Sequence, residues 1–169
     1  MSPHRRAAPW RVALAGGLLL LLAVGSAPAW GEGLPSPLRA YVPGSFKAIT
    51  QGEKAGDILL SFWSISCGPC RKEMPVLRAF QQRHPQVRVV LVSTDAPEDA
   101  DAVMEVLEQA QMLGVENWIF NDTFVERLRF EVSPRWRGEL PLNYLRRSNG
   151  KSALVMGAIP EDQLEQWFQ

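Results

Sequence analysis

Two short apolar runs stand out in the pattern of hydrophobic and polar positions. Residues 58–63 (ILLSFW) are rich in β-forming side chains and short enough to be a buried strand. Residues 87–93 (VRVVLVS) are typical of a central strand covered on both faces. Each run precedes a stretch with apolar residues at helical spacing, at 71–84 and 102–113. Because strand and helix alternate, the pattern predicts βαβ units with parallel strands.

The later part of the chain predicts shorter elements. They are a strand at 118–120, a helix at 123–130 that Asn121 could cap, strands at 141–146 and 151–156 joined by a tight turn at 148–150, and a final helix opened by Pro160. Pro75 falls inside the helix at 71–84 and should kink it. Residues 45–49 fit a short edge strand ahead of the others. This order predicts the α/β class, with a mixed central sheet flanked by helices on both faces.

Residues 1–29 have the pattern of a secretory signal peptide. Arginines precede an apolar run at 12–24, and an A-x-A cleavage signal follows at 27–29. The apolar run is shorter than the roughly 18–20 residues that a membrane-spanning helix needs. The alternative is an uncleaved membrane anchor at 12–25. Both alternatives predict a periplasmic or other extracytoplasmic location.

After the signal peptide, the sequence indicates a linker or N-terminal arm at 30–44 and one domain at 45–169. The whole chain has 18 Lys and Arg residues against 18 Asp and Glu residues. Removal of the signal peptide would take away three arginines and no acidic residue, which leaves a mildly acidic mature chain. This charge balance gives no sign of nucleic-acid binding. We expect the protein to be a monomer.

The chain has only two cysteines, Cys67 and Cys70, and they lie between the strand at 58–63 and the helix that follows it. Backbone N–H groups at the start of a helix are unpaired and carry partial positive charge, which stabilises a thiolate there. A fall of the thiol pKa from about 8.5 to about 7 would raise the thiolate share at neutral pH from a few per cent to roughly half. The position therefore predicts a reactive Cys67 and a resolving Cys70.

Three other interpretations of the cysteine pair are open. A structural disulfide across so short a loop would add only about 1.9 kcal/mol by chain entropy, against about 3 kcal/mol for a fifteen-residue loop. A zinc site needs four ligands, and the sequence has no second cysteine pair and only His84 as a histidine after residue 29. Two ordinary buried thiols would not account for Gly68-Pro69 between them. Redox chemistry fits the spacing and the position best.

The segment FWSISCGPCRKEMPVL resembles the active-site segment of thioredoxins. Its pattern C-x-x-C-x-x-E-x-P, formed by Cys67, Cys70, Glu73 and Pro75, is similar to that of the extracytoplasmic TlpA/ResA branch, which includes the cytochrome c maturation reductases. The resemblance implies a thioredoxin fold over 45–169. It also implies a thiol–disulfide oxidoreductase with no metal and no cofactor beyond its cysteine pair.

The resemblance extends to a second part of the site, the segment LPLNYLRRSNGK, which begins at Leu140. In thioredoxin-like proteins a cis-proline lies against the cysteine pair, and Pro141 occupies the matching position. A substrate chain could then add as a short strand along Leu140, beside Cys67. The alternative is a trans-proline that opens a strand, since only about 5–6% of X–Pro bonds are cis.

The sequence departs from these relatives at several site positions. Ser66 stands where relatives usually have Trp, and Ser61 where thioredoxins have a buried Asp that acts as general base for the resolving thiol. Proton transfer would then rely on water or on a carboxylate such as Glu73 or Glu139. Leu140 replaces the Thr that is frequent before the cis-proline, which should change the choice of partner.

Arginines are frequent in the segment just before and after the proposed cis-proline. They are Arg127, Arg129, Arg135, Arg137, Arg146 and Arg147, with Glu126, Glu131 and Glu139 among them. Such a set is usually a solvated face. The alternative is a docking patch for an acidic partner, in which Trp136 would be an aromatic anchor beside Leu140.

The reaction that we expect is reduction of disulfides in exported proteins. Cys67 would attack the substrate disulfide, and Cys70 would resolve the mixed disulfide. The thioredoxin dipeptide Gly68-Pro69 favours this direction. The resemblance implies a membrane electron donor of the DsbD/CcdA kind and substrates such as apocytochrome c. The alternatives are a disulfide oxidase or isomerase, and a non-catalytic peptide-binding module with a thioredoxin fold.

Overall fold

The computed structural model describes residues 37–52 and 56–169. The signal peptide predicted at 1–29, the alternative anchor at 12–25 and the predicted linker up to residue 36 lie outside the described residues. The elements are β1 (Leu38–Tyr41), α1 (Ser45–Gln51), β2 (Ile58–Trp63), α2 (Gly68–Arg83), β3 (Arg88–Ser93), the 3-10 turn η1 (Pro97–Asp99), α3 (Ala100–Gln109), β4 (Glu116–Phe120), α4 (Val125–Val132), β5 (Leu142–Arg146), β6 (Ser152–Met156) and α5 (Glu161–Phe168). Among the described residues, no helix combines the length and the apolar character needed to cross a membrane.

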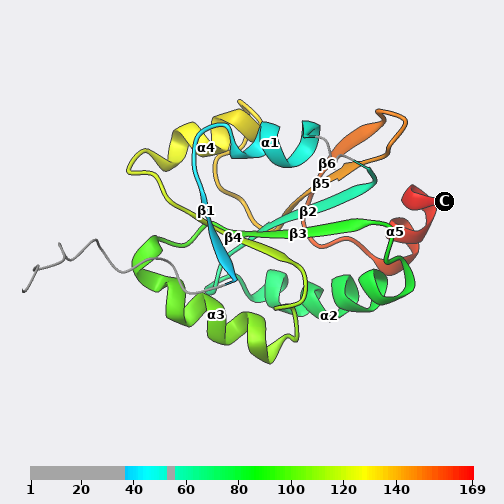
Figure 1. The fold of residues 1–169 in the computed structure, drawn as a ribbon, viewed down its shortest axis with the longest axis horizontal. Helices are drawn as coiled ribbons and strands as arrows, with labels where there is room; N and C mark the ends of the chain where they lie inside the picture. The colour runs from blue at the N-terminus through cyan, green and yellow to red at the C-terminus, as the bar shows by residue number, and fades with distance from the viewer. Residues whose placement is uncertain (1–36, 53–55) are drawn as a thin grey trace, which may run out of the picture. The chain divides into compact units, whose positions relative to one another are not determined.

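A mixed sheet with the strand order β1-β4-β3-β2-β5-β6 lies at the centre of the described residues (Figure 1). Strands β1, β4, β3 and β2 are parallel, whereas β5 runs antiparallel to β2 and β6 antiparallel to β5. The two apolar runs of the sequence form β2 and β3 in the middle of this sheet, where their side chains are buried almost throughout. The predicted α/β class and mixed sheet are therefore confirmed.

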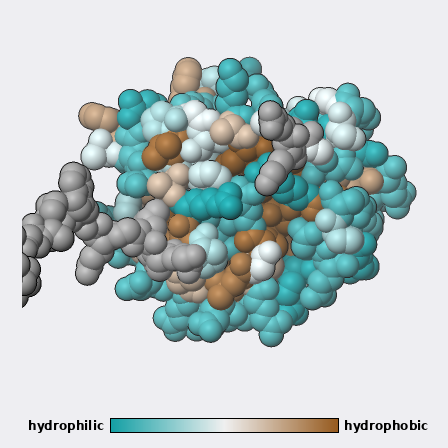
Figure 2. Space-filling model, in the orientation of Figure 1, coloured by the Kyte–Doolittle hydropathy of each residue, from teal (hydrophilic) through white to brown (hydrophobic). Residues whose placement is uncertain are grey.

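Helices cover both faces of the sheet, with α1 and α4 on one side and α2 and α3 on the other (Figure 1). Alternating residues of β2 enter two separate hydrophobic clusters. Leu59 and Trp63 pack in the cluster that includes side chains of α2, α3 and α5. Ile58, Leu60 and Phe62 pack with α1 and α4. Most of the surface in the view of Figure 2 is hydrophilic, with apolar patches near its middle.

The predicted linker at 30–44 is wrong for its last part, because Leu38–Tyr41 is a strand. It pairs with β4 in parallel, from Leu38 opposite Asn117 to Tyr41 opposite Phe120. Leu38 and Tyr41 are buried. Four residues are too few to show a hydrophobic period, and the prolines on either side, Pro37 and Pro43, made the segment look irregular. The folded domain consequently begins before residue 45.

The strand predicted at 45–49 is also wrong, because Ser45–Gln51 is the helix α1. Gly44 has a φ of 88°, a conformation that favours glycine and turns the chain out of β1. The Ser45 side chain then accepts a hydrogen bond from the Val42 N–H at 2.9 Å. This turn chemistry starts a helix whose apolar Ile49 is buried in the core.

The helix predicted at 123–130 starts and ends two residues later, at Val125–Val132. Asn121 does not cap it, because Phe124 is the residue directly before the helix and no side chain caps that end. Asp122 accepts a hydrogen bond from the Phe124 N–H at 2.8 Å, and this local turn delays the helix. Pro75 lies inside α2 and Pro160 directly before α5, as predicted.

Candidate active site

Cys67 and Cys70 form a disulfide at the point where β2 leads into α2. Cys67 is the residue just before the helix, and its sulfur accepts a hydrogen bond from the Cys70 N–H at 3.2 Å. Cys67 is half-buried, Gly68 and Pro69 are exposed, and Cys70 is only 2% exposed. An incoming thiol can therefore reach the Cys67 sulfur, whereas the Cys70 sulfur faces the core.

Asp95 holds the loop that precedes Cys67. One carboxylate oxygen accepts from the Ser64 hydroxyl at 2.7 Å, and the other accepts from the Ile65 N–H at 3.0 Å and from the Ser93 hydroxyl at 2.6 Å. The Ser64 carbonyl in turn accepts from the Cys67 N–H at 3.0 Å. Asp95 thus fixes the backbone from which Cys67 enters α2.

The sequence alone gave no role to Asp95, although its position carried a signal. Residues 64 and 95 come just after the two central parallel strands, and the carboxyl ends of parallel strands meet at one edge of a sheet. Ser66, at the position where relatives usually have Trp, is exposed, and its hydroxyl lies 3.0 Å from that of Ser64. Ser66 therefore places a second hydroxyl beside the Ser64 hydroxyl, which donates to Asp95.

The peptide bond between Leu140 and Pro141 is cis, as predicted from the family resemblance. The ladder between β2 and β5 ends with Phe62 opposite Leu142, so Leu140 and Pro141 continue beyond it at the same end of β2 as the disulfide. The Pro141 carbonyl accepts from the Gly157 N–H at 2.8 Å. Leu140 is half-buried and packs against the cluster that contains both cysteines.

Glu73 is a buried carboxylate one helical turn after Cys70 on α2, and only 3% of it is exposed. Its Oε1 atom accepts from the Ile159 N–H at 2.7 Å and from the Asn143 side-chain amide at 3.0 Å. Its Oε2 atom is buried without a hydrogen-bond partner among the described residues. Asn143 pairs with Ser61 across β2 and β5, so its hydrogen bond places Glu73 next to the strand position where the sequence lacks a buried Asp. The site therefore contains a buried acid, which helix α2 supplies rather than strand β2.

Comparison with known proteins agrees with this geometry. The family model described as Thioredoxin matches residues 40–113. The described residues have the thioredoxin fold. The chain is 27% identical over 131 residues to Sporulation thiol-disulfide oxidoreductase A of Bacillus subtilis, in an alignment that covers 72% of each chain.

Two further proteins resemble this chain. Thiol-disulfide oxidoreductase ResA of Bacillus cereus is 25% identical over 117 residues, which are 69% of this chain and 64% of ResA, so the chain spans just under two thirds of that relative. The crystal structure of a secreted Mycobacterium tuberculosis disulfide oxidoreductase homologous to E. coli DsbE has the same fold, with a TM-score of 0.53 and 22% identity over 66% of this chain and 78% of that one. With its disulfide at the start of α2, the chain is similar to these thiol–disulfide oxidoreductases in sequence and in the position of its cysteine pair.

Glu73 has an unusually high pKa for a glutamate, and its environment explains why. Burial raises its pKa from the ordinary 4.5 to about 7, and the hydrogen bonds from Ile159 and Asn143 offset the increase only in part. A carboxyl with such a pKa can both give and accept a proton near neutral pH. Glu139, the other carboxylate considered from the sequence, is exposed, and its pKa is lowered, chiefly by backbone hydrogen bonds.

The prediction that Trp136 is a surface anchor is wrong. Only 4% of Trp136 is exposed, and its ring lies 4.8 Å from that of Phe62 and 6.5 Å from that of Phe120, measured between centroids. Its indole N–H donates to the Glu139 carbonyl at 2.9 Å. An indole whose one donor has a partner can be buried at little cost. Trp136 therefore belongs to the core beneath the cis-proline segment.

No group of three or more His, Cys, Asp or Glu side chains that could hold a metal ion occurs in the part of the chain that the structure describes. The redox-active group is the Cys67–Cys70 pair itself.

Proposed function

We propose that the protein is an extracytoplasmic reductase of disulfides in exported proteins. The observation that supports this most directly is the arrangement of the two sulfurs, with Cys67 half-buried at the start of α2 and Cys70 buried behind it. The cis-proline segment lies at the same end of β2. This arrangement suits a dithiol that attacks with its first sulfur and resolves with its second.

In the proposed reaction, the reduced enzyme starts with a Cys67 thiolate and a Cys70 thiol. The Cys67 sulfur attacks one sulfur of the substrate disulfide, and the other substrate sulfur leaves as a thiolate that takes a proton from water. Cys70 then loses its proton and attacks the Cys67 sulfur, which releases the second substrate thiolate. Two electrons pass from the enzyme dithiol to the substrate, and the enzyme is left with the disulfide seen in the structure.

Glu73 is the proposed acceptor of the Cys70 proton. It follows Cys70 by one turn on the same side of α2, and both are buried. A buried thiol loses its proton with difficulty, so a neighbouring base that titrates near neutrality makes the resolving step faster. The pKa of about 7 fits this task, and the unpartnered Oε2 atom is the atom that would take the proton.

The proposed location and partners rest on the sequence and on relatives. Residues 1–29 have the signal-peptide pattern, with an anchor at 12–25 as the alternative, and the similar Mycobacterium tuberculosis protein is described as secreted. An exported reductase needs electrons from outside its own compartment. We therefore propose a membrane donor of the DsbD/CcdA kind, with apocytochrome c among the candidate substrates.

The reduction potential of the Cys67–Cys70 couple tests the direction. Equilibration with a glutathione buffer should give a value nearer to about −270 mV, as for thioredoxin, than to about −120 mV, as for DsbA. A value near −120 mV would instead support a disulfide oxidase. Cys70→Ser should trap the substrate as a mixed disulfide, which mass spectrometry can identify. Full biological activity of Cys67→Ser would show that the protein is a non-catalytic binding module.

A further inference from the structure

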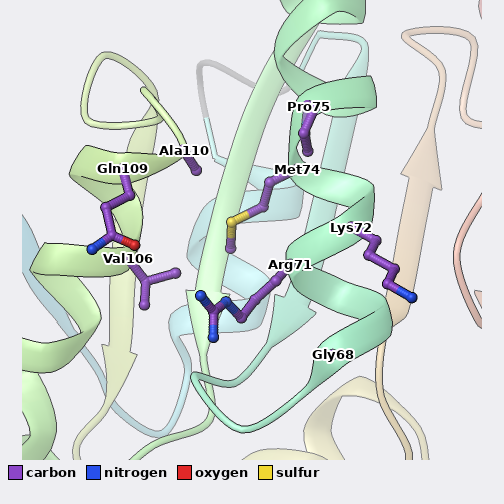
Figure 3. A pocket seen from close by; sticks show the side chains of 8 residues that line it. All are labelled: Gly68, Arg71, Lys72, Met74, Pro75, Val106, Gln109 and Ala110. Atoms are coloured by element: carbon purple, nitrogen blue, oxygen red, sulfur yellow. The ribbon is translucent and has the colours of Figure 1, made fainter.

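A groove runs between α2 and α3 beside the disulfide, on a part of the surface that the proposed reaction does not use. It has a volume of about 430 Å³. The residues that line it are Gly68, Arg71, Lys72, Met74 and Pro75 of α2 and Val106, Gln109 and Ala110 of α3 and its end (Figure 3). Because it begins at Gly68, a substrate joined to the Cys67 sulfur has this groove within immediate reach.

The groove has an apolar wall and a cationic end. Figure 3 shows Met74 pointing from α2 into the gap between the two helices, opposite Val106 of α3. The Arg71 side chain extends into the same gap, whereas Lys72 points away from α3, to the other side of α2. Arg71 is therefore the cation that faces a ligand in the groove.

Arg71 has no carboxylate partner among the described residues, and its side chain is exposed. The carboxylate of Glu105 on α3 accepts instead from the Gln109 side chain at 3.0 Å. Arg71 also lies in the first turn of α2, where the helix dipole disfavours a cation and where no acidic residue balances it. A guanidinium in this position is well suited to bind a carboxylate that comes from outside.

We propose that the groove binds the segment of a disulfide substrate that flanks the target cysteine, and that it selects an acidic side chain next to an apolar one. The substrate carboxylate pairs with Arg71, and the apolar side chain packs against Val106 and Ala110 on the α3 side. Met74 is only 2% exposed and forms the floor of the groove. This inference rests on the proposed reductase function. It names the substrate class as acidic, apolar peptide segments around a disulfide.

Symmetric peptide disulfides test the proposal, because either sulfur then has the same flanking residues. Three peptides differ only beside the cysteine, with Glu-Leu, Lys-Leu or Glu-Ser, and the reduced enzyme is mixed with each oxidised dimer. The rate constant is divided by that for bis(2-hydroxyethyl) disulfide, so that changes in the reactivity of Cys67 cancel. We expect the Glu-Leu dimer to react about tenfold faster than the Lys-Leu dimer, and faster than the Glu-Ser dimer.

Arg71→Glu should reverse the preference for Glu-Leu over Lys-Leu, and Lys47→Glu is the matched control. It places the same negative charge on an exposed side chain of α1, on the opposite face of the sheet from α2. The preference of this control for Glu-Leu should stay within about twofold of the wild type. Equal normalised rates for all three dimers with the wild-type enzyme would overturn the groove proposal, as would equal effects of Arg71→Glu and Lys47→Glu. Failure to reduce even bis(2-hydroxyethyl) disulfide would instead overturn the proposed function, and the groove proposal with it.

Discussion

Replacement of Glu73 by glutamine should remove a pH dependence of stability that the buried carboxyl creates. In the unfolded chain this carboxyl titrates near its ordinary pKa of 4.5, and in the folded protein burial raises the pKa to about 7. The folded state therefore binds the proton more tightly than the unfolded state does. The resulting stabilisation is complete below about pH 4.5 and is lost as the pH rises through about 7.

The size of the effect follows from the difference between the two pKa values of Glu73, 4.5 and about 7. At about 1.36 kcal/mol per pKa unit, the free energy of unfolding should fall by about 3 kcal/mol between pH 4.5 and pH 8 because of this group alone. For a domain of this size, with a total stability of about 5–15 kcal/mol, such a change is easy to measure. Other groups also titrate over this range, so the wild type alone is not sufficient.

Urea denaturation of the oxidised wild type and of Glu73→Gln, at several pH values from about 5 to about 8.5, isolates the contribution of Glu73. The free energy of unfolding of the variant, relative to that of the wild type, should rise by about 3 kcal/mol with pH. The matched control is Glu139→Gln, which makes the same chemical change on an exposed side chain whose pKa is lowered. Its difference from the wild type should not rise with pH. A Glu73→Gln difference that is constant over the whole range would refute the raised pKa.

Three further predictions concern Asp95, Trp136 and the exposed arginines. Asp95→Ala leaves the Ser64 hydroxyl and the Ile65 N–H without their acceptor. The free energy of unfolding should therefore fall by about 1–3 kcal/mol, and the rate of Cys67 alkylation should change. Wild-type values for both would show that Asp95 does not hold the loop. Trp136→Ala should cost about 3–5 kcal/mol in urea denaturation, and a loss under about 1 kcal/mol would contradict its place in the core. Charge reversal at Arg135 and Arg137 together should slow the reduction of an acidic partner protein but leave the rate with a small disulfide unchanged. Equal rates of variant and wild type with the partner protein would rule out a docking patch there.

The central part of the fold could be predicted because its signal is local. The runs that form β2 and β3 are continuous and apolar, and each is followed by a helical pattern, so strand, helix and cysteine pair fall into place together. The cis peptide at Pro141 could be predicted only through the family resemblance, since most X–Pro bonds are trans. The segment Leu38–Tyr41 gave no such signal, because it becomes a strand only through its pairing with β4.

The rest of the site depends on contacts between residues far apart in the sequence. Glu73 is a candidate base from the sequence, but its hydrogen-bond donors Asn143 and Ile159 follow it by 70 and 86 residues. Asp95 acquires its role only when β2 and β3 lie side by side. Trp136 was misplaced because it is flanked by exposed arginines, and nothing local shows that its ring turns inward against Phe62.

The hydrogen bond from the Ile159 N–H to Glu73 has a consequence for biosynthesis. A ribosome makes both cysteines 89 residues before it reaches Ile159. A nascent or truncated polypeptide that ends before that point contains the complete C-x-x-C sequence, but its Glu73 lacks this backbone donor. The surroundings of the proposed proton acceptor are therefore complete only after residue 159 has been made.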